Sequence, residues 1–194
     1  MLKKTLILSG SPRKAGNTAA LISAFADGVR EEGMEAEVIS TAFLKYKANG
    51  CTSCRKCQKL DKYECVIDDG ARPVLAKMLD ADAIVFATPL YFFSASAQLK
   101  IIIDRMFSLY KWDNKNNTME TPLKGKTLVL LASAYEDIGL DALEKPFKLT
   151  ADYTGMKYRS LLVPDAGVSG EIKGKNPDAL KKAYELGKET AKNI

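Results

Sequence analysis

The chain has 194 residues, of which 46% are hydrophobic and 27% charged, and it carries a formal net charge of +5 with no histidine. This composition is typical of a soluble globular protein, and no Pro-, Gly- or Ser-rich stretch divides it, so we expect a single domain over residues 1–194. The lack of histidine excludes Ser-His-Asp and Cys-His nucleophile systems and every His-ligated metal site, so chemistry must come from a cofactor or from the cysteines.

Charge and hydropathy also restrict the classes of molecule that the protein is expected to bind. The sequence shows no signal-peptide pattern and no apolar run that could span a membrane, which predicts a cytoplasmic protein without membrane association. The lysines are spread along the chain instead of forming one basic stripe. The positive charge therefore favours a phosphorylated small molecule over nucleic acid.

Hydrophobic periodicity predicts strands and helices that alternate along the chain. Strands are expected at 5–8, 37–39, 83–86, 127–131 and 158–163, and helices around 22–29, 74–79, 99–106, 140–151 and 177–187, the last capped by Asn176. Continuous apolar strands are covered on both faces, and right-handed crossovers place them in a parallel sheet. The prediction is an α/β, flavodoxin-like, doubly wound five-stranded parallel sheet of order 2-1-3-4-5 with helices on both faces. A ligand is expected at the switch point between the first and third strands.

The first predicted strand runs into a helix through a loop of small and polar residues. Backbone N–H groups and hydroxyls at the start of a helix form a seat for an anion. Asn17 stands where a P-loop has its lysine, and the glycine spacing differs from the dinucleotide fingerprint, which leaves a compact monophosphate as the ligand. The alternative is an N-capped surface turn. The residues expected at this seat are Ser9, Ser11, Arg13, Asn17 and Thr18.

The third predicted strand ends in a loop with three successive aromatic residues, Tyr91, Phe92 and Phe93. Aromatic rings can stack on a planar ligand, while loop N–H groups bond the polar edge of a heterocycle. The alternative, in which a ring closes the core or a subunit interface, suits Phe93 at least as well. The residues expected around a planar ring are Pro89, Leu90, Tyr91 and Phe92, with Ser133 and Tyr135 after the fourth strand as a third wall.

These two segments resemble the signature motifs of the NADPH-dependent FMN reductase family, especially its iron-sulfur flavoprotein branch. The motifs are Gly10-Ser11-Pro12-Arg13 through Gly16-Asn17-Thr18, and Thr88-Pro89-Leu90-Tyr91-Phe92 through Gln98-Leu99-Lys100 and Ile103-Asp104-Arg105. The resemblance implies FMN, with its phosphate in the first loop and its isoalloxazine ring beside Pro89 to Phe92. It also implies a homodimer or homotetramer. Asp104 and Arg105 are interpreted as structural or interfacial.

All four cysteines lie in one segment, expected as a loop at about residues 45–67 and called here the cysteine segment. The pattern Cys51-x2-Cys54-x2-Cys57-x7-Cys65 resembles the compact motif of iron-sulfur flavoproteins, in which a 4Fe-4S cluster lies near the flavin. Closely spaced thiolates can wrap several corners of a cubane. The spacing differs from the bacterial ferredoxin run, and similar sequences retain such cysteines without a cluster. A cluster, a cluster-free loop or redox disulfide, and tetrahedral zinc therefore stay open.

The resemblance implies an oxidoreductase in which FMN accepts hydride from NADH or NADPH and passes electrons to a small-molecule or protein acceptor. No catalytic side chain is expected, because the flavin carries the chemistry. A second hypothesis is an iron-sulfur electron carrier, whose cluster receives electrons from a ferredoxin-like protein. A third is a metal-stapled interaction module without flavin, against which the phosphate loop and the aromatic loop both argue.

Overall fold

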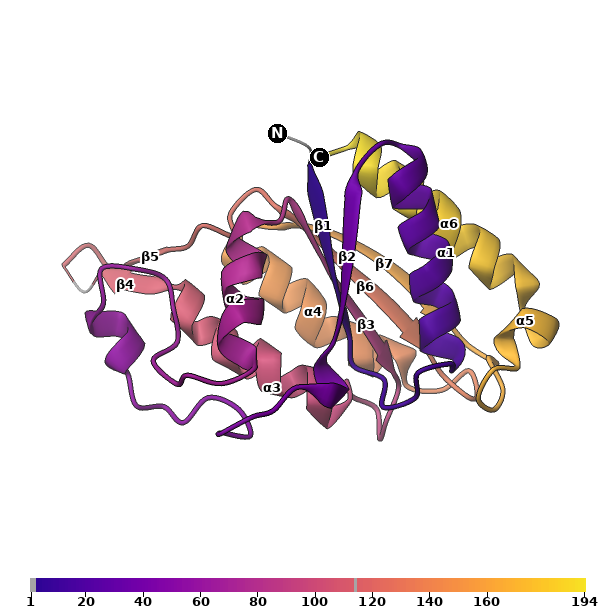
Figure 1. Ribbon diagram of the computed structural model, residues 1–194, viewed down its shortest axis with the longest axis horizontal. Coiled ribbons are helices and arrows are strands. Elements are labelled where there is room, and N and C mark those ends of the chain that lie inside the picture. Colours follow the sequence, from indigo (N-terminus) through magenta and orange to yellow (C-terminus); the bar gives the residue numbers. More distant parts are fainter. Residues whose placement is uncertain (1–2, 114) are drawn as a thin grey trace.

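A five-stranded parallel sheet forms the centre of the protein, as a computed structural model describing residues 3–113 and 115–194 shows (Figure 1). The sheet order is β2-β1-β3-β6-β7. In register, Ile7 lies opposite Val38 on one side and Val85 on the other. This order confirms the predicted flavodoxin-like fold. The strands are β1 (Lys4–Ser9), β2 (Glu35–Ser40), β3 (Ala83–Pro89), β6 (Thr127–Ser133) and β7 (Lys157–Val163).

Helices cover both faces of the sheet, because successive strand residues point to opposite sides. Leu8, Phe86 and Leu130 belong to the core under α2, α3 and α4. Ile7 and Val129 belong to the core under α1, α5 and α6. The helices are α1 (Asn17–Glu31), α2 (Ala71–Asp80), α3 (Ala97–Arg105), α4 (Leu140–Thr154), α5 (Ile172–Lys175) and α6 (Pro177–Lys192).

Two glycines allow α1 and α6 to pack closely. A Cβ added to Gly28 would lie 2.1 Å from the Tyr184 carbonyl oxygen, and one added to Gly187 would lie 2.2 Å from that of Phe25. Such distances are too short for any larger residue, so the two backbones touch. This packing fixes α1, whose amino terminus lies at the carboxyl end of the sheet.

A small hairpin and the cysteine segment lie together at one end of the molecule (Figure 1). The hairpin consists of β4 (Lys111–Asp113) and β5 (Thr118–Glu120), which pair antiparallel. Sequence periodicity did not predict it, because strands of three mostly polar residues carry no usable alternation. Short 3-10 helices occur at η1 (Thr41–Phe43), η2 (Lys56–Lys59) and η3 (Met106–Leu109). None of the helices in the described part of the chain combines the length and apolar character that crossing a membrane requires.

Candidate functional site

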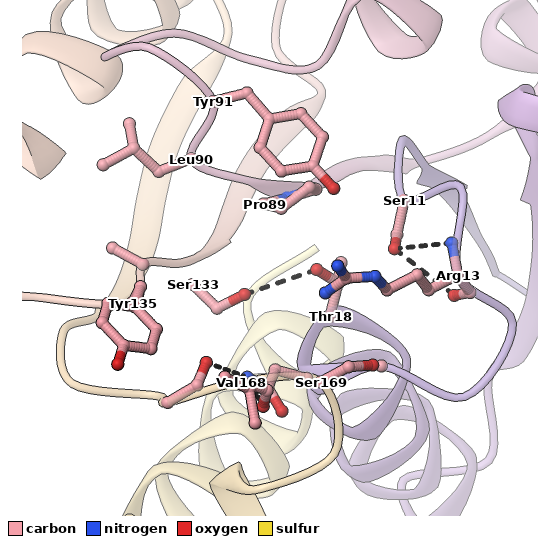
Figure 2. A pocket seen from close by; sticks show the side chains of 14 residues that line it. Ser11, Arg13, Thr18, Pro89, Leu90, Tyr91, Ser133, Tyr135, Val168 and Ser169 are labelled. Atoms are coloured by element: carbon pink, nitrogen blue, oxygen red, sulfur yellow. Dashed lines mark hydrogen bonds between the residues drawn. The ribbon is translucent and has the colours of Figure 1, made fainter.

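A cavity of about 450 Å³ lies at the carboxyl end of the sheet, at the predicted switch point (Figure 2). Its volume falls in the range of small-molecule sites, roughly 300–1,000 Å³. Residues from four separate loops surround it, so the site exists only in the folded chain. The lining residues are Ser11, Arg13, Gly16, Asn17, Thr18, Pro89, Leu90, Tyr91, Ser133, Ala134, Tyr135, Gly167, Val168 and Ser169.

One side of the cavity presents hydroxyl groups and the amino terminus of α1. Ser11 and Thr18 are buried, and the Thr18 and Ser133 hydroxyl oxygens lie 3.4 Å apart. The Ser11 hydroxyl also accepts a hydrogen bond from the Arg13 N–H, 3.2 Å away, which closes a tight turn. Among the described residues, no side chain caps the N–H groups at the start of α1. Those N–H groups and hydroxyls can bind an anion.

The opposite side is formed by the loop that follows β3. Figure 2 shows the Tyr91 ring beside Pro89, across the cavity from Val168 and Ser169. Tyr91 and Ser94 exchange backbone hydrogen bonds of 3.0 and 3.1 Å, which makes a tight turn. Phe92, inside that turn, has a φ of 44° and a side chain 99% exposed. The turn therefore directs Tyr91 to the cavity and Phe92 to solvent.

The two motif loops are joined to each other directly. The Gly10 N–H donates to the Ala87 carbonyl, and the Ser96 hydroxyl donates to the Gly10 carbonyl, both at 2.7 Å. Ser96 also caps α3 by accepting from the Leu99 N–H. A Cβ on Gly10 would lie 2.6 Å from the Ser96 hydroxyl oxygen. Glycine is thus required where the first loop crosses the start of α3.

The structure brings most of the predicted site residues to this cavity. Ser9 and Phe92 do not line it. Ser9 ends β1, and its carbonyl accepts from the Thr41 hydroxyl at 3.0 Å. Phe93 also lies outside it and packs on Gly139, where an added Cβ would lie 2.2 Å from its ring. The residues that do line it are Ser11, Arg13, Asn17, Thr18, Pro89, Leu90, Tyr91, Ser133 and Tyr135.

Sequence reasoning missed the wall formed by Gly167, Val168 and Ser169. These residues follow β7, the last strand of the sheet. A signal was present, because the carboxyl ends of parallel strands meet at one edge and the loop after the fifth predicted strand must reach it. Its composition resembles no binding motif, so only its position in the topology could have identified it.

The four cysteines surround a second, much smaller cavity. Cys51 and Cys54 are exposed, and Cys57 and Cys65 are buried. All four line a space of about 20 Å³, together with Arg105. Within residues 3–113 and 115–194, no three His, Cys, Asp or Glu side chains are grouped as a single metal ion requires. Four cysteines that line one space provide the ligand types of a cubane, which takes each thiolate at a different corner, and of a four-cysteine zinc site.

A buried ion pair lies beside Cys65. The Arg105 and Asp69 side chains are 0% and 1% exposed, and the Arg105 Nη1 lies 2.7 Å from both Asp69 carboxylate oxygens. Arg105 Nη2 also lies 3.4 Å from the Cys65 Sγ. Burial opposes both charges, but the hydrogen bonds between them keep the pKa of Asp69 below, and that of Arg105 above, its ordinary value.

Two further features of the small cavity favour negative charge. The Arg105 Nε is buried and has no hydrogen-bond partner among the described residues. A hydrogen bond from the Lys56 backbone, aided by one from the Thr52 side chain, lowers the pKa of the Cys54 thiol. A buried cation with an unused donor beside ionisable thiols suits thiolates and an anionic group bound by them.

The fold and the larger cavity define a class: a flavodoxin-like domain with a cavity of small-molecule size where the strand order reverses. Within that class, the chain belongs to the NADPH-dependent FMN reductase family, whose sequence profile matches residues 3–161. Family membership confirms the resemblance predicted from the two motifs.

Several curated relatives share part of the sequence. An iron-sulfur flavoprotein of Methanocaldococcus jannaschii is 41% identical over 102 residues, which are 53% of this chain and 51% of the relative. An iron-sulfur flavoprotein of Methanosarcina thermophila is 37% identical over 99 residues, 50% of this chain and 49% of the relative. The chain spans about half the length of the curated relatives it matches.

Solved structures support the fold. An azoreductase from Bacillus anthracis superposes over 100% of both chains with a TM-score of 0.72 at 15% identity. An FMN-dependent NADH-azoreductase from the same species, in complex with FMN, covers 98% of both chains with a TM-score of 0.70 at 16% identity. A flavodoxin from the Archaea has a TM-score of 0.60, 14% identity, and coverage of 97% of this chain and 96% of its own.

Proposed function

We propose that this chain binds FMN in the 450 Å³ cavity and acts as an NAD(P)H-dependent oxidoreductase. The observation that carries the proposal is the convergence of both family motifs on one cavity, with hydroxyls and a helix amino terminus on one side and Tyr91 on the other. Membership of the FMN reductase family supports it. So does the matching fold of an azoreductase described in complex with FMN.

The side chains fit a flavin mononucleotide. The N–H groups at the start of α1 and the buried hydroxyls of Ser11 and Thr18 would hold the phosphate, and Arg13 would add positive charge. Tyr91 and Tyr135, which are 41% and 62% exposed, would flank the ring system where the cavity meets solvent. When bound, FMN supplies the hydride and electron chemistry, and the protein supplies orientation.

Two measurements test this proposal. FMN is added to the flavin-free protein while its fluorescence is followed, and the loaded protein is then mixed anaerobically with NADH or NADPH. We expect binding, followed by loss of the oxidised flavin absorbance with at least one nicotinamide and its return on adding an acceptor. If FMN binds but neither NADH nor NADPH reduces it, the proposal of an NAD(P)H-dependent reductase is wrong. Light scattering of the loaded protein tests the proposed homodimer or homotetramer.

A second candidate function is that of an iron-sulfur electron carrier. The specific observation in its favour is that Cys51, Cys54, Cys57 and Cys65 all line one cavity beside the buried Arg105. These thiolates would hold a 4Fe-4S cluster, which exchanges single electrons with a ferredoxin-like partner. In this proposal the electrons then pass to a small-molecule or protein acceptor.

Anaerobic purification separates the two candidates. The carrier is supported by a brown protein with iron and acid-labile sulfide in equal amounts, and by a Cys65→Ser variant that loses both but still binds FMN. A yellow protein with FMN and no iron contradicts the carrier and supports the reductase. Stoichiometric zinc in a colourless protein contradicts both candidates and favours an interaction module.

A further inference from the structure

The side chain of Asn17 is fully occupied by a distant loop, residues 164–171 between β7 and α5. Its two amide N–H groups are shared among three carbonyls of that loop, and its amide oxygen accepts from the N–H of Gly170 and from that of Ile172, the first residue of α5. An asparagine amide has two N–H donors and one oxygen with two lone pairs, so no hydrogen-bonding capacity remains for a ligand. The nitrogen bonds are to Ala166 (2.9 Å), Gly167 (3.1 Å) and Val168 (3.1 Å), and the oxygen bonds are from Gly170 (2.8 Å) and Ile172 (3.3 Å).

The loop needs such an anchor. Asp165, Gly167 and Gly170 have φ values of 50°, 68° and 88°, in the left-handed region. For Asp165 that conformation is costly and persists when surrounding contacts impose it. Ala166 packs in the core, but the loop makes few other hydrogen bonds to the rest of the chain. Ala166 bonds to the Ala134 carbonyl at 2.9 Å, and Val168 bonds to Glu171 within the loop itself.

The anchored loop completes the cavity on the side of the α1 amino terminus. Gly167, Val168 and Ser169 line the cavity. A Cβ added to Gly16, the residue before α1, would lie 3.4 Å from the Ser169 hydroxyl oxygen. The loop therefore lies directly beside the proposed phosphate seat, and Asn17, at the first position of α1, holds it there.

We infer that the Asn17 side chain is a positioning group that holds the 164–171 loop as a wall of the phosphate end of the cavity, acting on FMN through the loop and not by direct side-chain contact. This inference rests on the proposed function for the identity of the ligand. The anchoring itself consists of hydrogen bonds between residues of this chain, so it can be tested without the ligand.

Hydrogen exchange of the flavin-free protein tests the anchoring. In Asn17→Ala, we expect the Gly170 and Ile172 amides to exchange about tenfold or more faster, since both lose their acceptor. Asn17→Asp keeps an acceptor and loses the donors, so exchange should rise less; this variant also serves if Asn17→Ala does not fold. The matched control is Asn116→Ala, an exposed asparagine of the β4–β5 turn. Unchanged exchange at Gly170 and Ile172 in both Asn17 variants would overturn the inference.

Flavin titration tests the consequence for binding. We expect Asn17→Ala to raise the Kd for FMN about tenfold and that for riboflavin, which lacks the phosphate, less, while Asn116→Ala changes neither. Weaker FMN binding with unchanged exchange would mean direct contact and would overturn the positioning role, as would faster exchange with unchanged FMN binding. Failure of the wild type to bind FMN contradicts the proposed function instead, and the exchange experiment still decides the anchoring.

Discussion

The cavity and the cysteine segment are built by different means. The cavity is formed where strands end, and backbone hydrogen bonds join its loops, such as Leu90 N–H to the Ser133 carbonyl at 2.9 Å. The cysteine segment contains one short 3-10 helix and is held by side-chain hydrogen bonds between it and the rest of the chain. Gln58 bonds to the Tyr110 carbonyl, Lys111 to the Leu60 carbonyl, and Arg105 to Cys65.

Because of this difference, we expect substitutions in the cavity and in the cysteine segment to change different properties, ligand affinity in the first case and folding stability in the second. A cavity supported by the central sheet keeps its shape when one lining side chain changes, so substitutions there should alter ligand binding first. A segment that depends on a few buried polar contacts loses its order when one of them is removed, so substitutions there should alter stability first. The following experiments test whether substitutions in the two regions differ in this way.

The largest effect is expected from Asp69→Ala. It leaves the Arg105 guanidinium buried without its carboxylate, which should lower the free energy of unfolding by about 3–5 kcal/mol. FMN affinity should stay near that of the wild type. Asp68→Ala is the matched control: that side chain is 80% exposed and pairs with Arg72 at 3.5 Å, so its loss should cost less than about 1 kcal/mol in urea unfolding. Equal costs for both variants would show that the buried pair does not anchor the segment.

Thr18→Val is expected to have the opposite pattern to Asp69→Ala, with weaker FMN binding and little change in stability. Removing a buried hydroxyl from the proposed phosphate seat should weaken FMN binding by roughly tenfold to a hundredfold, because hydrogen bonds to charged groups contribute roughly 1.5–3 kcal/mol. Riboflavin binding and urea unfolding should change little. Thr150→Val, on the exposed side of α4, is the control for fluorescence titration. Equal losses of FMN and riboflavin affinity would place the phosphate elsewhere.

Gly10→Ala should disturb the junction between the two motif loops. The added methyl group would lie 2.6 Å from the Ser96 hydroxyl oxygen and 2.7 Å from the Leu99 Cβ, so one loop must move. We expect a loss of about 1–3 kcal/mol in urea unfolding, as for overpacking in a core, together with weaker FMN binding. Gly174→Ala, where nothing lies within 4 Å, should change neither quantity. Intact FMN binding in Gly10→Ala would show that the two loops tolerate separation.

The smallest effect is a pH dependence. The pKa of Asp69 is lowered in the folded state, because the hydrogen bonds from Arg105 and two backbone N–H groups outweigh the effect of burial. Its stabilisation is therefore complete above the ordinary Asp value of 3.8 and is lost as the pH falls through the lower folded-state pKa. Urea unfolding from neutral to acidic pH should show this loss in the wild type and not in Asp69→Asn. Parallel pH profiles would contradict it.

Sequence reasoning reached the sheet and much of the cavity because both follow from local patterns. Apolar runs such as residues 83–86 predict covered strands, and the alternation of strands and helices restricts the topology to a few windings. Once the winding is known, Ser11 and Tyr91 must come to the same edge. The hairpin at Lys111–Glu120 escaped prediction because its strands are short and polar.

The roles of Asn17, Asp69 and Arg105 could not be predicted in this way. Asn17 belongs to a motif expected to hold phosphate, yet its amide is used by a loop about 150 positions further along the chain. Asp69 was assigned no role, and Arg105 was predicted to be structural or interfacial without a partner being named. The buried pair that they form bears on the cysteines, and Arg105 lies 3.4 Å from the Cys65 Sγ. Such contacts link residues whose separation along the chain carries no periodic signal.

Local sequence patterns were enough to predict the order of the strands, the place of the switch point and the two loops that meet there, because periodicity and turn chemistry act over neighbouring residues. The tertiary structure alone decided which polar groups face the cavity and which are used up inside the protein. The physical reason is that a buried donor or acceptor must find a partner, and the fold determines which partner is within reach.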